Sequence, residues 1–342
     1  MRVLLTGAAG FIGSHIAEEL TTRGHEVVSV DNLLPQAHSS VPEWTNFVRG
    51  DVQDFDLMTR LLDGVDAVCH QAAVVGHGLD PSDAPLYVRN NDHGTAVVLA
   101  AMHSAGVRKL VLASSMVVYG EGRYVCSVHG DVRPEPRVSI DLKAGRYEPS
   151  CPICGDSVDW ALIEEDAPLD PRSTYAATKV AQEHLASTWA RQADGNVWAL
   201  RYHNVYGPRM ARDTPYAGVA ALFRSALERG EAPTVLEDGM QLRDFVHVTD
   251  VAVANVLALE SSVSGFVPVN VCSGSPHTVG ELAQALASAY GGPSPQIVGG
   301  ARSGDVRHIV ASPVAAQRLL GFQARVGFAE GVRAFASDPL RA

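Results

Sequence analysis

The sequence predicts an α/β protein built on a doubly wound parallel sheet, with a smaller mixed α/β lobe beside it. Strand-like and helix-like segments alternate through the first 115 residues, which is typical of a parallel sheet covered by helices on both faces. The last 140 residues mix short strands with helices, as expected of a second lobe. The length of 342 residues agrees with roughly two domains.

The elements are assigned in chain order from their hydrophobic patterns. Short apolar or β-branched runs predict strands at 3–6, 26–31, 47–48, 67–70, 109–113 and 197–202. Helical periodicity predicts first-lobe helices at 11–22, 91–105 and 173–193. Gly24 follows the first of these helices, and glycine is a common helix stop. The same periodicity predicts later helices at 217–229, 249–260, 279–290 and 313–320.

Residues 121–172 interrupt this order. They are rich in Pro, Gly, Cys and charged residues and show no clean periodicity. Such a length is unusual for a plain loop, so we expect the segment to have its own organisation. We therefore divide the chain into two lobes. The first is 1–203, with 121–162 as an inserted module and about 240–270 also included, and the second is 204–239 with 271–342.

Composition excludes several classes of function. The net charge of −11 repels phosphate backbones, so we expect no nucleic-acid partner. No apolar run reaches the roughly 18 residues of a membrane span, and no signal peptide precedes the first strand. We expect a cytoplasmic protein without a membrane partner. Disulfides are improbable in that reducing compartment, so the five cysteines need another explanation.

A glycine-rich loop follows the first strand and opens the first helix. Its spacing, G-x-x-G-x-x-G at Gly7, Gly10 and Gly13, allows a tight turn, a close approach to a pyrophosphate and close helix packing. The helix N-terminus would face the anion. Asp31 ends the second strand, where a carboxylate accepts hydrogen bonds from ribose hydroxyls and repels a 2′-phosphate. Together these features predict a dinucleotide site for NAD rather than NADP.

Tyr175 and Lys179 have i, i+4 spacing at the start of a predicted helix, so they share one face. A tyrosine with a pKa of about 10 is a poor base at neutral pH. A cation about 5 Å away, at an effective dielectric of about 20, favours the phenolate by roughly 3 kcal/mol. With Ser114 and Ser115 closing the fifth strand, the pair predicts an active site.

These motifs resemble the extended short-chain dehydrogenase/reductases, and within them the nucleotide-sugar epimerase/dehydratase branch. The resemblance covers nearly the whole chain except about 121–160 and implies a Rossmann-type first lobe. It lies in the following segments: Thr6–Gly13, Asp31-Asn32-Leu33, Gly50-Asp51-Val52, His70-Gln71-Ala72-Ala73, Asn91-x-x-Gly94-Thr95, Ser114-Ser115, Val118-Tyr119-Gly120, Tyr175-x-x-x-Lys179 and Arg201-Tyr202-His203-Asn204-Val205-Tyr206-Gly207-Pro208.

The resemblance implies roles for individual residues. Tyr175 would be the acid/base, Lys179 would hold the nicotinamide ribose, and Ser115 would bind the sugar oxygen. The predicted NAD site comprises Gly7, Gly10, Phe11, Ile12, Gly13, Asp31, Asn32, Asp51, Val52, Gln71, Ala72, Ala73, Asn91, Ser114, Tyr175, Lys179 and His203. The predicted substrate site, with the two arginines on diphosphate and nucleoside, comprises Ser115, Met116, Asn204, Arg243 and Arg302.

Exclusion of the other reactions of this family favours an epimerase. There, a sugar hydroxyl at C4 is oxidised by bound NAD⁺. The 4,6-dehydratases then use an Asp-Glu pair after the catalytic Ser/Thr, whereas this chain has Met116 and Val117, which carry no proton. A 4-ketoreductase commonly uses NADP, which Asp31 disfavours. A 4-epimerase needs no further acid. A non-enzymatic NAD(H)-sensing regulator is the remaining alternative, and intact Ser115, Tyr175 and Lys179 oppose it.

A narrower resemblance points to one group of epimerases. Ser114-Ser115-Met116, Tyr119-Gly120-Glu121-Gly122-x-Tyr124, the long insertion, 214–219 and Glu237-Asp238-Gly239 look like the dTDP-L-rhamnose 4-epimerases and their relatives. The expected substrate is a dTDP- or UDP-linked hexose or 6-deoxyhexose. Family members also pair through helices corresponding to about 90–105 and 174–192, which implies a homodimer.

The insertion holds a possible metal site. Cys126 and His129 form a C-x-x-H turn, Cys151 and Cys154 form a C-x-x-C turn, and a glycine follows each pair. Four soft ligands suit tetrahedral zinc with no open position, so the metal would be structural. A redox pair, a catalytic metal or no metal are the alternatives. The module enters between Tyr119 and Tyr175, so we expect it to flank or cover the sugar pocket. Outside it, Cys69 and Cys272 are predicted to be buried small hydrophobes.

Overall fold

The computed structural model describes residues 1–34, 46–76, 80–212, 218–301 and 305–341. Its centre is a parallel sheet of seven strands, which run in the order β13-β9-β5-β4-β1-β2-β3. These strands are β1 (Arg2–Thr6), β2 (Glu26–Asp31), β3 (Phe47–Arg49), β4 (Ala67–His70), β5 (Lys109–Ser115), β9 (Asn196–Tyr202) and β13 (Gly265–Val271). The strand order reverses between β1 and β4, the switch point beside which ligands bind in doubly wound folds.

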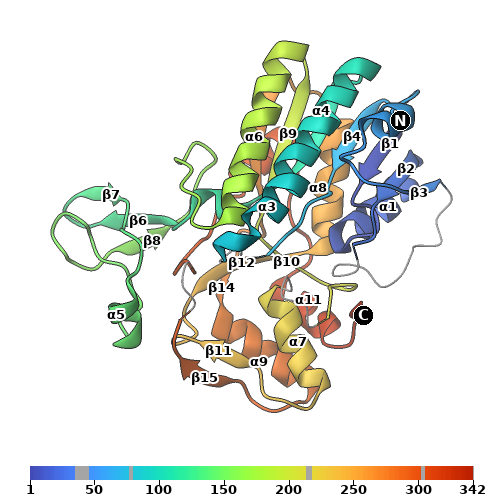
Figure 1. Ribbon diagram of the computed structural model, residues 1–342. Coiled ribbons are helices and arrows are strands. Elements are labelled where there is room, and N and C mark those ends of the chain that lie inside the picture. Colours follow the sequence, from blue (N-terminus) through green and yellow to red (C-terminus); the bar gives the residue numbers. More distant parts are fainter. Residues whose placement is uncertain (35–45, 77–79, 213–217, 302–304, 342) are drawn as a thin grey trace.

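Helices cover both faces of this sheet (Figure 1). On one face lie α1 (Phe11–Thr22), α8 (Val248–Glu260) and α10 (Val314–Leu320), and on the other lie α2 (Phe55–Leu61), α4 (Gly94–Ala105) and α6 (Thr174–Ala193). Alternate residues of each strand enter the two cores: Val3 and Leu5 pack on the α1 side and Leu4 on the α2 side. Burial of each such side chain contributes about 1.5–3 kcal/mol.

Short turns lead into the helices on the α4 side. The 3-10 turn η1 (Pro81–Asp83), the short helix α3 (Ala84–Tyr87) and the wider π-type turn η2 (Val88–His93) precede α4. The helix predicted at 91–105 therefore begins as a π-type turn. A 3-10 turn, η3 (Met116–Tyr119), follows β5.

The second lobe lies beyond the carboxyl ends of the sheet strands (Figure 1). It contains a three-stranded sheet, β10 (Asn204–Tyr206), β12 (Leu242–His247) and β14 (Pro276–Thr278), and a pair, β11 (Thr234–Leu236) and β15 (Gln296–Gly299). Its helices are α7 (Val219–Glu228), α9 (Val279–Tyr290) and α11 (Phe328–Phe335), which pack around a third core. Thus β12 belongs to the small sheet, whereas α8 and β13 join the large one.

The insertion is a separate module that projects from one side of the molecule (Figure 1). Its strands β6 (Arg123–Cys126), β7 (Gly130–Val132) and β8 (Asp159–Ala161) form an antiparallel sheet in the order β7-β6-β8, and α5 (Ser139–Lys143) follows β7. The interruption predicted at 121–172 therefore does have its own organisation. Among the described residues, no helix is both long and apolar enough to cross a membrane.

Candidate active site

The loop between β1 and α1 has the geometry predicted for it. Gly7 takes a φ of +67°, and a Cβ added there would lie 2.7 Å from the Ala72 main-chain nitrogen. A Cβ on Gly13 would lie 2.1 Å from the Gly7 carbonyl oxygen. Only glycine fits at these two positions. Gly10, the N-cap of α1, brings no side chain to the first turn of the helix. The main-chain amides of that turn can therefore face an anion. The cradle fits a dinucleotide pyrophosphate.

Two carboxylates lie beside this loop. Asp31 ends β2 and accepts hydrogen bonds from the main-chain amides of Ala9 at 3.1 Å and Leu33 at 2.8 Å. Asn32 donates its side-chain amide to Asp51 at 3.2 Å. The polar groups predicted to meet the ribose and adenine thus lie together at the carboxyl edge of the sheet.

Asn91 joins the segment after β4 to the helix that carries Tyr175. Its side chain is fully buried, accepts from the Val74 amide at 2.8 Å and donates to the Val74 carbonyl at 3.0 Å. It also donates to the Thr178 hydroxyl on α6 at 3.0 Å. Nearby, Gln71 donates to Asn255 at 3.1 Å. These contacts fix the floor of the predicted cofactor site relative to the helix.

Ser115, Tyr175 and Lys179 come together at the carboxyl end of β5. Ser173 caps α6 with its hydroxyl and thereby sets where the helix begins. The Lys179 ammonium lies 5.8 Å from the centre of the Tyr175 ring and donates to the Ala113 carbonyl at 3.0 Å. The Ser115 hydroxyl hydrogen-bonds to the Tyr175 phenol. The three residues predicted to be catalytic therefore form one constellation.

Burial controls the protonation of this constellation. It raises the pKa of Tyr175, and the hydrogen bond from Ser115 acts in the opposite direction. Burial also lowers the pKa of Lys179 to about 8, although the Glu183 and Asp92 carboxylates partly oppose this. A lysine with such a pKa is charged at neutral pH but loses its proton in mildly alkaline solution.

A buried ion pair, Glu183 with Arg201, joins the elements that carry the constellation. Glu183, one helical turn after Lys179, is paired with Arg201 of β9 through bonds of 2.7 and 2.9 Å. Ser114 donates its hydroxyl to Glu183 at 2.5 Å, so this predicted cofactor residue is tied to α6. Arg201 also bonds to the Tyr119 hydroxyl, which donates to Asn270 at 2.7 Å. The network binds the ends of β5, β9 and β13 to α6.

The substrate side of the site is formed where β9 passes into β10. His203 is buried, and burial lowers its pKa to about 4, so its imidazole is neutral at physiological pH. Within the described chain the Asn204 side-chain oxygen is buried without a hydrogen-bond partner, which suits a ligand that donates. Arg243 donates to the main-chain carbonyls of Leu242, Val306 and Arg307 at 2.8–2.9 Å.

The predicted substrate site also includes Met116 and Arg302. Met116 begins the turn η3 directly after Ser115, and this places it beside the constellation. Arg302, predicted to bind diphosphate or nucleoside, lies outside the described residues, as do 214–217.

The four metal ligands predicted in the insertion come together. The ligand atoms of Cys126, His129, Cys151 and Cys154 all lie within 4.8 Å of one another. Both cysteines at 126 and 151 have their sulfur 3.6 Å from the His129 Nδ1. The Cys126 and Cys154 sulfurs are 3.8 Å apart, and both residues are free thiols.

Each turn of this cluster has the predicted knuckle form. The glycines that follow the two pairs, Gly130 and Gly155, take φ values of +68° and +79°. The main-chain amides of Val128 and His129 point at the Cys126 sulfur and lower its pKa. Amides that stabilise a thiolate in this way are what a metal-binding turn requires.

The structure also reveals site residues that the sequence did not single out. The Tyr87 ring lies 6.1 Å from that of Tyr175, and the C-terminal Arg341 donates to the Ala9 carbonyl in the glycine loop. Burial of Cys69 and Cys272, at 0% and 1% exposure, confirms that they are core residues. Neither Tyr87 nor Arg341 stands in a motif, so only the fold could connect them with the site.

Comparisons with known proteins agree with this geometry. The sequence profile described as "NAD dependent epimerase/dehydratase family" matches residues 3–136 and 149–272. A dTDP-L-rhamnose 4-epimerase from Burkholderia thailandensis is 32% identical over 97% of this chain and 93% of its own. A UDP-glucose 4-epimerase from Mycolicibacterium smegmatis is 33% identical over 97% of this chain and 96% of its own.

A solved structure extends the comparison to three dimensions. The UDP-glucose 4-epimerase of Thermus thermophilus, in complex with NAD, matches with a TM-score of 0.79 and 35% identity over 98% of both chains. These comparisons confirm the predicted fold class and the predicted class of enzyme, an isomerase. The chain belongs to the NAD dependent epimerase/dehydratase family.

Proposed function

We propose that the protein is an NAD-dependent nucleotide-sugar 4-epimerase, which oxidises C4 of a nucleotide-linked hexose or 6-deoxyhexose to a transient 4-keto sugar and returns the hydride to the opposite face. The observation that carries the proposal is the constellation of Ser115, Tyr175 and the buried Lys179, which lies at the same carboxyl edge of the parallel sheet as the glycine cradle. NAD, when bound, supplies the acceptor and donor of the hydride.

The chain's own residues move the proton. Tyr175 takes the proton of the C4 hydroxyl during oxidation and gives it back during reduction. Ser115 hydrogen-bonds the phenol and can orient the sugar oxygen in line with it. Lys179, 5.8 Å from the ring centre, supplies the positive charge that favours the phenolate. Because both half-reactions use the same tyrosine, no second acid is needed.

The neighbours of Ser115 support an epimerase over the other reactions of the family. Met116 and Val117 begin the turn after Ser115 and cannot protonate a leaving hydroxyl, as a 4,6-dehydratase requires. Asp31 lies at the ribose end of the cradle with its carboxylate bonded to Ala9 and Leu33, and its charge disfavours the 2′-phosphate of NADP that a reductase commonly uses. Retained NAD⁺ therefore fits best.

We propose a dTDP- or UDP-linked sugar as the substrate. The support is the similarity to a dTDP-L-rhamnose 4-epimerase and a UDP-glucose 4-epimerase over nearly the whole chain. The test incubates the purified protein with UDP-, dTDP- and GDP-sugars in deuterated water without added cofactor. We expect an epimerised product without deuterium at C4, since the hydride returns within the site. A stable 4-keto-6-deoxy product would contradict the proposal.

We also propose that the cysteine cluster holds a structural zinc ion. Tetrahedral zinc with Zn–S bonds of about 2.3 Å and Zn–N bonds of about 2.0 Å requires S···S and S···N separations of roughly 3.8 and 3.6 Å. The Cys126–Cys154 and Cys126–His129 separations are 3.8 and 3.6 Å. Four ligands leave no open position for catalysis. Elemental analysis of protein purified without chelators should find one zinc per chain, and a metal-free protein would refute the site.

The remaining proposals concern assembly and division of the chain. We propose a homodimer that pairs through the groove between α4 and α6, which is lined by small and apolar side chains such as Ala96, Ala100 and Leu185. The division into lobes stays a proposal as well, but the part of 240–270 that forms β12 pairs in the small sheet of the second lobe, so the chain returns to the first lobe at α8 rather than at 240. The five free thiols suit the reducing cytoplasm, which we propose as the location.

A further inference from the structure

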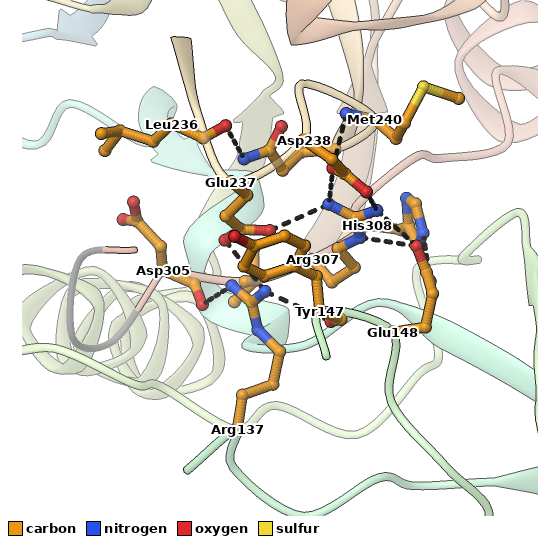
Figure 2. A network of polar contacts seen from close by, with 12 residues as sticks. Arg137, Tyr147, Glu148, Leu236, Glu237, Asp238, Met240, Asp305, Arg307 and His308 are labelled. Carbon is orange, nitrogen blue, oxygen red and sulfur yellow. Dashed lines mark hydrogen bonds and ion pairs between the residues drawn. The ribbon is translucent and has the colours of Figure 1, made fainter. Parts of the chain in front are cut away.

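One of the contacts between the insertion and the second lobe is made by a buried arginine. Arg137 donates to the Glu237 carboxylate at 2.9 Å and to the Asp305 carbonyl at 2.5 Å (Figure 2). The side chains of Arg137 and Glu237 are only 6% and 2% exposed. A charge-assisted bond formed away from water is stronger than one on the surface. The contact therefore fixes the position of the insertion against residues far away in the sequence.

A second arginine joins the same residues from the other side. Arg307 is 1% exposed and donates to Glu237 at 2.9 Å, to Asp238 at 2.7 Å and to Glu148 of the insertion at 2.7 Å (Figure 2). Two guanidinium groups thus face three carboxylates. His308 continues the contact, with its Nε2 2.9 Å from Glu148. The network therefore joins the insertion to the second lobe.

The segment 305–307 is held between the insertion and β12. Arg137 binds the carbonyl of Asp305, and Arg243 of β12 binds the next two carbonyls, those of Val306 and Arg307. The Arg307 main-chain amide donates in turn to Glu121, at the base of the insertion, at 2.6 Å. The orientation of the Arg243 guanidinium consequently depends on a segment that Arg137 holds in place.

We infer that Arg137 is a positioning residue for the nucleoside diphosphate part of the substrate. It fixes the 305–307 backbone, which fixes Arg243, the residue proposed above to meet the diphosphate. This inference rests on the proposed function. The insertion is then part of substrate binding. Loss of the Arg137 contact lowers affinity for the diphosphate and leaves the proton transfer at Tyr175 intact.

The test compares three variants with the wild type. Arg137→Met removes the contacts with Glu237 and the Asp305 carbonyl, and with them the 3.4 Å bond to the Tyr147 carbonyl. Arg137→Met combined with Glu237→Gln also lacks the donor to Asp305 but restores the charge balance of the network. Arg146→Met is the matched control, because Arg146 lies in the same module and pairs with Asp141 at the surface. For each protein, calorimetry measures the binding of UDP, dTDP and NAD⁺, and kinetics measure KM and kcat.

We expect Arg137→Met to weaken UDP or dTDP binding about tenfold and to raise KM similarly, because a charge-assisted bond is lost. NAD⁺ binding and kcat should stay close to wild type, and the double variant should bind UDP or dTDP as weakly as the single one. The melting temperature should fall in Arg137→Met, because the buried Glu237 carboxylate loses one of its two arginine partners. Unchanged nucleotide binding would overturn the inference. So would a parallel loss of NAD⁺ binding, or full recovery in the double variant.

The same measurements separate this inference from the proposed reaction. Nucleotide binding requires no turnover, so a wild-type protein that binds UDP or dTDP but epimerises no sugar contradicts only the proposed function. A wild-type protein that binds neither nucleotide overturns the inference.

Discussion

Tyr175 has the chemistry that most directly distinguishes this molecule at the scale of single residues. It is the proposed acid/base of the constellation with Ser115 and Lys179. We expect Tyr175→Phe to lower kcat by about 10²- to 10⁴-fold, because proton transfer by a positioned side chain contributes that much. NAD⁺ binding should fall far less than kcat, since Tyr175 is one of many residues in the predicted NAD site and the variant lacks only its phenol oxygen. Near wild-type turnover of this variant would refute the assigned role.

The pKa of Lys179 predicts how kcat depends on pH. Burial lowers its pKa from 10.5 to about 8, so its ammonium group is charged below pH 8 and neutral above. Because that charge favours the Tyr175 phenolate, kcat should fall as the pH rises through about 8. Lys179→Met should be poorly active throughout and show no such decline. A wild-type kcat that stays constant from pH 7 to 10 would contradict this role.

Unfolding would not explain that decline. Between pH 8 and 10.5 the unfolded chain holds the Lys179 proton more tightly than the folded chain does. The contribution of this residue to stability therefore rises with pH over the same window. Melting temperatures measured alongside kcat separate the two effects.

The sequence predicts which residues react but not the side chains that hold them in place, and the reason is physical. Ser115, Tyr175 and Lys179 stand in short motifs whose spacing defines a shared face. Glu183 and Arg201 form a buried pair, yet an acidic residue in a helix and an arginine in a strand are usually solvated. Nothing local in the sequence signals that the two charges meet after folding.

Among the structural elements, the inserted module is expected to depend on the zinc ion proposed for its cysteine cluster. The insertion contains a sheet of three short strands and the cluster of Cys126, His129, Cys151 and Cys154. We expect so small a sheet to need the cluster for its stability. Cys154→Ser removes an exposed cysteine of the proposed zinc site and should reduce bound zinc well below one per chain. The protein should then be cut within 121–162 by a protease that spares the wild type.

The matched control is Cys69→Ala, which changes a buried cysteine outside the cluster. Inductively coupled plasma mass spectrometry gives the zinc content, and peptide mapping gives the cleavage sites. Equal zinc and equal cleavage in Cys154→Ser and wild type would count against a structural metal.

The elements differ in how far the sequence could predict them. The strands of the large sheet are apolar on both faces, so β1, β2 and β4 were assigned with the bounds the structure shows within one residue. The insertion has few apolar residues, and its ligands, not its periodicity, indicated its organisation. Its attachment through Arg137 and Glu237 joins residues one hundred positions apart, which no periodic pattern reveals.

At the scale of the whole molecule, the seven-stranded sheet, the second lobe and the insertion meet around one site. The glycine cradle belongs to the sheet, Arg243 to the second lobe, and Arg137 to the insertion. Each part contributes a different portion of the proposed substrate and cofactor site. The α4–α6 face covers the large sheet, away from the second lobe (Figure 1), so pairing there would leave the proposed substrate and cofactor site uncovered.

This face yields the last prediction, the homodimer. Leu185 is 37% exposed in the groove between α4 and α6, and the small side chains Ala96 and Ala100 allow a partner helix to approach closely. Leu185→Glu places a charge in that contact, which costs far more in a buried interface than on a free surface. We expect the wild type to be a dimer and this variant a monomer by size-exclusion chromatography with light scattering. Leu319→Glu is the matched control, because Leu319 is 44% exposed on α10, and it should remain dimeric. A monomeric wild type, or a Leu185→Glu variant that stays dimeric, would place the interface elsewhere or remove it.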